Sequence, residues 1–252
     1  MSVKLMCASD THGLVDIGKL ALRAIRCKAN VLVLAGDIQP ARLDMNPDAY
    51  FNFTFIPSMM DLYSRGIDVV ITPGNHDFWL KSRFESGYIK KEFGRRIHLL
   101  VDKAETVCGL KFYGTPWCPY INGQWCYEEN DDALAYRFSV IPRGVDVLVT
   151  HSPPYMDNDL DCCDVSMQHD RRYWKHFGSR SLRNAILEKK PRMVVCGHIH
   201  SGEHRPIALG DSAVVNVSLV DERYRESYPP TDAMIGEEIR FRNGGKKWTK
   251  VN

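Results

Sequence analysis

The chain has 252 residues, of which 44% are hydrophobic and 25% are charged, a composition typical of a folded globular protein. The 33 basic and 31 acidic residues give a formal net charge of +2, which excludes the strongly basic character of a dedicated nucleic-acid-binding protein. No apolar run approaches the ~20 residues that a membrane-spanning helix needs, and the N-terminus has no signal-peptide pattern. We therefore expect one cytoplasmic domain over residues 1–252 that does not engage a membrane.

Five short apolar runs predict β-strands, and each has Gly, Pro or Ser at or near its end. Continuous apolar runs of this length are typical of interior strands that are buried on both faces. The five runs, in chain order, are 3–9, 31–36, 68–74, 146–152 and 192–198.

Helical patterns separate several of these strands. After Asp16, a residue type that caps helices, apolar residues recur at the spacing of one helix face from Ile17 to Ile25. Residues 48–65 and 179–190 are further helix candidates, the second beginning at Ser179 or Ser181 and ending before Pro191. The alternation of strands and helices predicts an α/β sheet. The C-terminal region differs, since 205–210, 213–220, 237–243 and 246–252 are typical of a strand meander.

The eight cysteines form no CxxC pair, and we expect all of them to be free thiols in a cytosolic chain. They are Cys7, Cys27, Cys108, Cys118, Cys126, Cys162, Cys163 and Cys196.

Metal-competent side chains follow all five predicted strands. In open α/β sheets, functional sites are built at the carboxyl ends of the strands. Each piece alone has an ordinary explanation, because Asp and Asn form turns and caps and a single His is commonly only hydrogen-bonded. Because all five predicted strands in succession are followed by metal-competent residues, we favour one metal site to which all five strand ends contribute. The residues are Asp10 and His12, then Asp37, then Asn75, His76 and Asp77, then His151, then His198 and His200.

The order D-x-H, G-D, G-N-H-D, H and G-H-x-H resembles that of the calcineurin-like metallophosphoesterases. The resemblance implies an α/β fold, a four-layer α/β/β/α sandwich of two mixed sheets, with a dinuclear metal site at the strand ends. It also implies two ligand sets that share Asp37 as the bridge. The first set is Asp10, His12, Asp37 and His200, and the second is Asp37, Asn75, His151 and His198.

The resemblance further implies that a hydroxide bridging the two metals attacks phosphorus while His76 assists the leaving group. Asp77 would hold the ring of His76, although a turn or helix cap is an equally natural role for it. Mixed nitrogen and oxygen ligands favour Mn, Fe or Zn, with Mg or Ni as further options. The expected substrate is a small phosphate ester, possibly a nucleotide.

Two longer segments resemble the metallophosphoesterase-domain-containing branch, some members of which hydrolyse phosphodiesters, including cyclic nucleotides. These segments are "GTPWCPYINGQW" (114–125) and "IPRGVDVLVTHSPP" (141–154). Certain animal members replace the first histidine of the last motif with glycine, whereas this chain keeps His198. Relatives often have Glu at the position of Asp77, so this shorter carboxylate is a departure from the pattern of the family.

Other residues have both a structural and a functional interpretation. The basic pairs Lys90-Lys91 and Arg171-Arg172 are typical of solvated faces, although the second could meet a phosphate. His98 fits a structural role, and His204 could support the site. Trp117, Tyr120 and Trp125 could stack on a base or pack the loop against the sheet, and packing is favoured. The polar segment 155–178, with His169 and His176, is expected to overhang the site and set specificity.

Three functions remain open at this stage. The filled ligand positions favour a two-metal phosphoesterase. A metal-bound interaction scaffold with little catalysis is the second, and a nuclease acting on short nucleic acids is the third.

Overall fold

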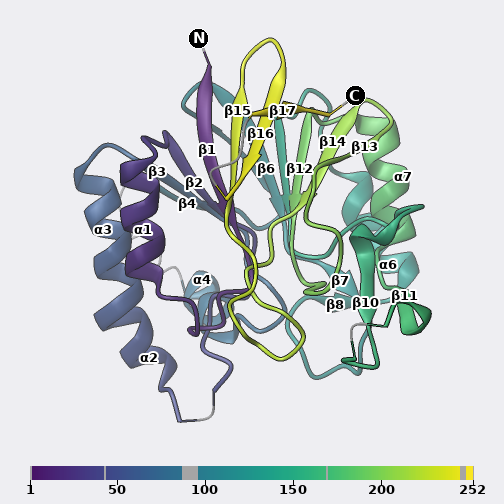
Figure 1. The fold of residues 1–252 in the computed structure, drawn as a ribbon, viewed down its shortest axis with the longest axis horizontal. Coiled ribbons are helices and arrows are strands. Elements are labelled where there is room, and N and C mark those ends of the chain that lie inside the picture. Colours follow the sequence, from purple (N-terminus) through teal and green to yellow (C-terminus); the bar gives the residue numbers. More distant parts are fainter. Residues whose placement is uncertain (1, 43, 87–95, 169, 245–247, 252) are drawn as a thin grey trace.

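A computed structural model describes residues 2–42, 44–86, 96–168, 170–244 and 248–251. Two mixed β-sheets pack face to face, and helices cover the outer face of each sheet (Figure 1). The layer order is therefore helix, sheet, sheet, helix, which confirms the predicted α/β/β/α sandwich.

The first sheet has seven strands in the order β17-β16-β15-β1-β2-β3-β4. Strands β1 to β4 are parallel to one another, whereas β15, β16 and β17 each run antiparallel to their neighbours. The bounds are β1 Val3–Ala8, β2 Val31–Leu34, β3 Asp68–Ile71, β4 Ile97–Leu99, β15 Thr231–Ile235, β16 Ile239–Asn243 and β17 Thr249–Lys250.

The second sheet has six strands in the order β13-β14-β12-β9-β6-β5, with an antiparallel strand at each edge of a parallel centre. The bounds are β5 Lys103–Val107, β6 Leu110–Thr115, β9 Val147–Thr150, β12 Met193–Cys196, β13 Ile207–Leu209 and β14 Ser212–Asn216. Two small pairs complete the strands, β7 Cys118–Pro119 with β8 Glu128–Glu129, and β10 Cys162–Asp164 with β11 Trp174–His176.

Alternation along the strands produces three apolar layers. In β2, Val31 and Val33 face the core between the sheets, while Leu32 and Leu34 face the helices of the first sheet. Successive side chains of a strand point to opposite faces, so a run that is apolar throughout is buried on both sides. A third core lies between the second sheet and its own helices.

Two of the helices begin at caps that the sequence predicts. Asp16 accepts a hydrogen bond from Lys19 N at the start of α1, and Ser179 accepts one from Leu182 N at the start of α7. The helix bounds are α1 Ile17–Arg26, α2 Pro47–Tyr50, α3 Ile56–Ser64, α4 Phe78–Glu85, α6 Asp131–Ser139 and α7 Arg180–Lys189. A π-helical turn over Phe51–Phe55 joins α2 to α3, and short 3₁₀ turns cover Asp159–Asp161 and Arg171–Tyr173.

The C-terminal strands differ from the predicted meander. Strands β13 and β14 form a hairpin at one edge of the second sheet, whereas β15 to β17 extend the first sheet. Between them the chain crosses from one sheet to the other, and this crossing has no signature in the strand patterns themselves. Lys90-Lys91, His169 and part of 246–252 lie outside the described residues.

All eight cysteines are free, as predicted. Among the described residues, the helices are too short or too polar to span a bilayer.

Candidate metal centre

The predicted ligands come from loops at the carboxyl ends of parallel strands in both sheets. Asp10, Asp37 and Asn75 follow β1, β2 and β3 of the first sheet. His151 follows β9 of the second sheet, and His198 and His200 follow β12. Since the inner faces of the sheets are packed together, the two groups of loops meet at one end of the sandwich, opposite the N-terminus in Figure 1.

The backbone at these ends adopts conformations that most residues avoid. Asp10, His12, Asp37 and His198 have φ angles of 55°, 47°, 53° and 69°. Left-handed non-glycine residues are uncommon, cost free energy and cluster at functional sites, where the surrounding structure holds them. Here Asp10 N donates to Gly36 O and His12 N donates to Asp37 O, both at 2.9 Å, so the first two loops are hydrogen-bonded together.

A glycine stands where the ligand loops approach most closely. A Cβ on Gly74 would lie 2.1 Å from Asp37 Oδ1 and 2.5 Å from Asp37 N. Such distances are far inside van der Waals contact, so only glycine allows the third loop to approach the second. The glycine of the Gly-Asn-His sequence is therefore required for steric reasons, in addition to the ligand chemistry of the residues that follow it.

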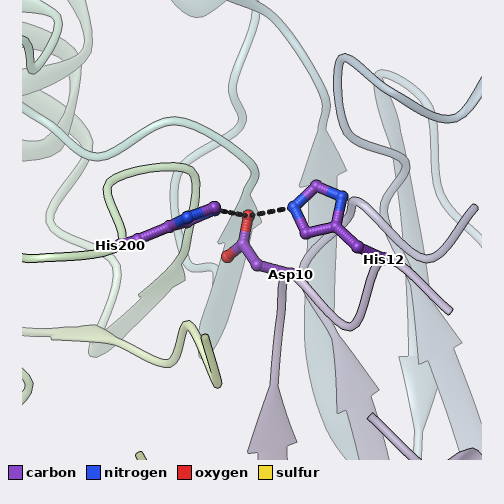
Figure 2. A group of neighbouring side chains, drawn as sticks. All are labelled: Asp10, His12 and His200. Carbon is purple, nitrogen blue, oxygen red and sulfur yellow. Dashed lines mark ion pairs between the residues drawn. The ribbon is translucent and has the colours of Figure 1, made fainter. Parts of the chain in front are cut away.

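The first ligand set converges on Asp10. Its Oδ1 lies 3.9 Å from His12 Nε2 and 3.4 Å from His200 Nε2, and Figure 2 shows the carboxylate between the two imidazoles. Asp37 Oδ2 lies 3.7 Å from His12 Nε2 on the other side. The other ring nitrogen of His200 is 3.2 Å from Asp221 O, a carbonyl that fixes the ring and leaves Nε2 directed at the carboxylate.

The second ligand set lies on the opposite oxygen of Asp37. His151 Nε2 is 3.4 Å from Asp37 Oδ1 and 2.8 Å from Asn75 Oδ1. His151 Nδ1 is 2.9 Å from Ala35 O, which again orients the ring. The ring of His198 lies 5.0 Å from that of His151, centroid to centroid, and completes the group. The two oxygens of Asp37 therefore face two different histidine clusters, an arrangement compatible with a bridging carboxylate.

Burial and charge shift the pKa values of these groups in opposite directions. Burial lowers the pKa of His12 to about 4 and that of His198 to about 3, so both imidazoles are neutral at neutral pH, the form that binds metal. Burial also acts on Asp37, but the neighbouring His151 and His12 outweigh it and hold the pKa of this carboxyl well below its usual value. His151 is buried as well, and the adjacent Asp37 raises its pKa to about 9. A bound cation would take over the charge compensation that His151 provides to Asp37.

The donor set fits divalent metal ions. Both ring nitrogens of the fully buried His12 lack a hydrogen-bond partner among the described residues, although buried polar atoms are nearly always paired. Ligand atoms of Asp10, His12 and His200 lie within 4.8 Å of one another, as do those of Asp10, Asp37 and His151. Two ligands about 2.1 Å from one tetrahedral ion stand about 3.4 Å apart, which is close to the observed separations.

His76 lies at the edge of this cluster rather than inside it. Its Nε2 is 3.9 Å from Asp37 Oδ2, and its side chain is 20% exposed, whereas that of His12 is fully buried. The backbone N of His76 donates to Asp37 Oδ1 at 2.9 Å. The imidazole therefore reaches the outer side of the metal cluster from a fixed backbone and remains open to an entering molecule.

Asp77 has a different environment from the one expected for a residue that holds His76. Its Oδ1 accepts from Ile38 N and Gln39 N at 2.8 and 2.7 Å, and its Oδ2 accepts from Gly74 N at 2.8 Å. This buried carboxylate thus joins the loop of Asp37 to the loop of Asn75. The turn alternative fits these contacts better than a helix cap or a bond to the imidazole, because all three donors belong to loop residues.

A cavity of about 660 Å³ opens beside His76. Its walls include Phe78, Trp125 and Tyr224, together with Leu14 and Met45. The Tyr224 ring lies 4.8 Å from that of His12, so the cavity borders the first ligand set directly.

Residues 3–202 match the sequence model of the calcineurin-like phosphoesterase family. The chain belongs to this family. Calcineurin-like phosphoesterases are hydrolases that act on phosphoric esters, and the candidate ligand clusters of this member lie in the matched region.

Relatives with curated names are similar over most of the chain. Metallophosphoesterase domain-containing protein 1 of Homo sapiens is 28% identical over 249 residues, covering 90% of this chain and 69% of the human protein. The UPF0046 protein T07D4.2 of Caenorhabditis elegans is 28% identical over 229 residues, covering 79% and 52%.

Solved structures share the fold at low sequence identity. The protein TT1561 of Thermus thermophilus has a TM-score of 0.62 at 14% identity, covering 96% of this chain and 99% of that one. A dimetal phosphatase from Danio rerio has a TM-score of 0.57 at 11% identity, covering 99% and 98%.

The other histidines that the structure describes, His98, His176 and His204, lie outside the cluster. His98 contacts Glu105 and Asp68 at 2.5 and 3.4 Å, which is the structural role predicted for it. His176 pairs with the buried Asp161 at 2.9 Å, beside Cys162, within the β10–β11 hairpin. His204 stacks on Tyr228 at 3.7 Å.

The segment 155–178 packs beside the loop of His198 and His200. Asp164 N donates to Ser201 Oγ at 2.7 Å, and Arg223 donates to Met167 O at 2.9 Å. The described walls of the cavity beside His76 include no residue of this segment. The role of this segment in specificity stays a prediction.

The three aromatic residues of 114–125 separate into different roles. Trp117 donates to Asp102 Oδ2 at 2.7 Å and lies under the Arg137 guanidinium at 3.8 Å, so it packs the loop as predicted. Tyr120 is 63% exposed and outside the cavity. Trp125 instead lies 4.2 Å from the ring of His76. Tyr224, which also borders the site, follows no motif and has no sequence signal that identifies it.

Proposed function

We propose that this member of the family is a metal-dependent phosphoesterase that acts on small phosphodiesters or nucleotides. The observation that carries the proposal is the position of Asp37, whose two oxygens face two histidine clusters while His76 stands at the open side. The curated name of the human relative, a metallophosphoesterase-domain protein, supports the same chemistry.

Asp10, His12, Asp37 and His200 would hold one divalent ion, and Asp37, Asn75, His151 and His198 would hold the other. Such a pair of ions lowers the pKa of bound water and neutralises charge on the phosphoryl oxygens. Nitrogen and oxygen donors favour Mn, Fe or Zn, with Mg or Ni also compatible.

His76 is the residue of this chain that we assign to proton transfer. Its Nε2 carries a proton toward the leaving oxygen, because the ring lies between the metal ligands and the cavity. Transfer of this kind contributes about 10²–10⁴ in rate. Asp77 holds the loop of Asp37 to the loop of Asn75, and we assign it no contact with the reacting groups.

The test is hydrolysis of bis-p-nitrophenyl phosphate and p-nitrophenyl phosphate after EDTA treatment and Mn²⁺ addition. We expect metal-dependent cleavage of the diester, a loss of about 10²–10⁴ in turnover for His76→Ala, and unchanged metal content. His176→Ala is the matched control, since this histidine lies in the β10–β11 hairpin and contacts no predicted ligand.

Unchanged turnover in His76→Ala removes the assignment of this residue. Bound metal with no turnover of either ester favours the interaction scaffold over the enzyme.

A further inference from the structure

The cavity beside His76 is lined mostly by apolar and aromatic side chains. Phe78 and Tyr224 are 43% and 39% exposed, although aromatic residues of this size are usually covered. Leu14, Met45 and Pro40 add to the apolar lining. A phosphoryl group at the metal ions leaves this surface uncovered, so it needs a different part of the ligand.

Two of the polar side chains that line the cavity already have partners. Gln39 Oε1 accepts from Trp79 N at 2.7 Å, and the guanidinium of Arg42 is paired with Asp44. The lining therefore offers mainly apolar contact area, which suits a flat apolar group.

The position of Trp125 is fixed by two independent sets of hydrogen bonds. The carboxylate of Glu128 accepts the backbone N–H groups of Ile121, Asn122, Gly123 and Trp125 at 2.6–3.1 Å. Cys126 N donates to Asn75 O at 2.9 Å, which ties the tryptophan loop directly to a predicted metal ligand. An aromatic wall held in this way loses little conformational entropy when a ring binds against it.

The position of Trp125 relative to His76 indicates which part of the ester substrate would contact the indole. The imidazole lies against the indole, with ring centroids 4.2 Å apart and planes tilted by 33°. A group on the far side of His76 from Asp37 therefore lies in the cavity, in contact with Trp125. If His76 protonates the leaving oxygen, this group is the leaving alcohol.

We propose that Trp125, Phe78 and Tyr224 form a subsite for a flat aromatic ring carried by the leaving group of the ester. This inference rests on the proposed function for the identity of the leaving group, while the ring subsite itself is a property of binding. The ring could be an aryl group bonded to the ester oxygen or a nucleobase one sugar away. Both sources share the stacking chemistry.

The experiment measures binding to the Mn²⁺-loaded protein by calorimetry, using phenylphosphonate and methylphosphonate, which carry the same metal-binding head and resist hydrolysis. We expect phenylphosphonate to bind about tenfold more tightly, which is about 1.4 kcal/mol and within the range of a base–aromatic stack. Trp125→Ala should reduce this preference to about twofold or less and leave methylphosphonate unchanged. Trp125→Phe should keep most of it.

Two further variants separate the subsite from general damage to the loop. Phe78→Ala alters the lining without touching the Glu128 hydrogen bonds and should reduce the preference in part. Tyr120→Ala, in the same loop but outside the cavity, should leave the preference intact.

Inhibition constants of AMP and ribose 5-phosphate then distinguish the ring sources. A tenfold advantage of AMP that Trp125→Ala removes indicates a nucleobase, and a preference confined to phenylphosphonate indicates an aryl ester.

Equal affinity for the ring-bearing and ringless ligands overturns the proposal. An equal weakening of both phosphonates by Trp125→Ala also overturns it, because Trp125 then only positions His76. A ring preference in a protein that cleaves no ester contradicts the proposed hydrolysis but leaves the subsite standing.

Discussion

Asp77 provides the most direct test of how the ligand loops are held together. Its carboxylate is fully buried and accepts three backbone N–H groups from two loops. Asp77→Asn keeps the shape of the side chain and one acceptor oxygen, but places an NH₂ group against one of the three donors. We therefore expect a loss of stability without a large change in packing.

The magnitude follows from one unsatisfied buried donor. Leaving such a group unpaired costs about 1–3 kcal/mol. For a chain of this size, each kcal/mol lowers the midpoint of thermal unfolding by about 2–4 °C, so the expected decrease is about 2–12 °C. Asp77→Ala leaves all three donors unpaired and should lower the midpoint further.

The assay is thermal unfolding followed by circular dichroism in EDTA, so that metal binding does not contribute. Asp132→Asn is the control, because it makes the same chemical change at an exposed position in the first turn of α6. An unchanged midpoint combined with lost turnover would refute our reasoning. That result would place Asp77 in the reaction through His76, as the resemblance to the family first implied.

Three other predictions concern the metal centre. Asp37→Asn should lower the content of both ions together, because the two Asp37 oxygens lie 3.4 Å from His151 Nε2 and 3.7 Å from His12 Nε2. The content is measured by mass spectrometry of the dialysed protein, and loss of a single ion with retained activity would contradict the bridging role. Gly74→Ala should abolish metal binding because its Cβ would meet Asp37 Oδ1 at 2.1 Å, whereas Gly236→Ala, with its nearest neighbour at 3.5 Å, should bind normally. Mn²⁺ at 100 times its dissociation constant should stabilise the protein by about 2.7 kcal/mol for each ion bound, and a midpoint that does not rise would argue against a site that forms only on folding.

The strand ends could be predicted because their pattern is local. Apolar runs ending in Gly or Ser predict buried strands, and the carboxyl ends of parallel strands meet at one edge. The same reasoning did not identify β5, β6 and β15 or helices α4 and α6. In β5, for example, Lys103–Val107 is largely exposed at a sheet edge and lacks a continuous apolar run.

The walls of the cavity could not be predicted in the same way. Trp117 and Trp125 occur in one motif, and only the tertiary structure places the first under Arg137 and the second against His76. Tyr224 reaches His12 from a loop more than two hundred residues away in the chain, held by bonds such as that from its own N to Asp221 O at 2.8 Å. No periodicity or motif in the sequence predicts the contact between Tyr224 and His12, because it depends on how the two sheets pack.

The origin of the ligands in both sheets has a consequence for the order of folding. Asp10 and His200 are contributed by different sheets and are separated by almost the whole family domain in sequence. A loop of that length closes slowly, and its closure must precede complete coordination. Metal capture is therefore a late event that reports the docking of one sheet on the other. Once bound, the ions would act as a cross-link between the two sheets at one end of the sandwich.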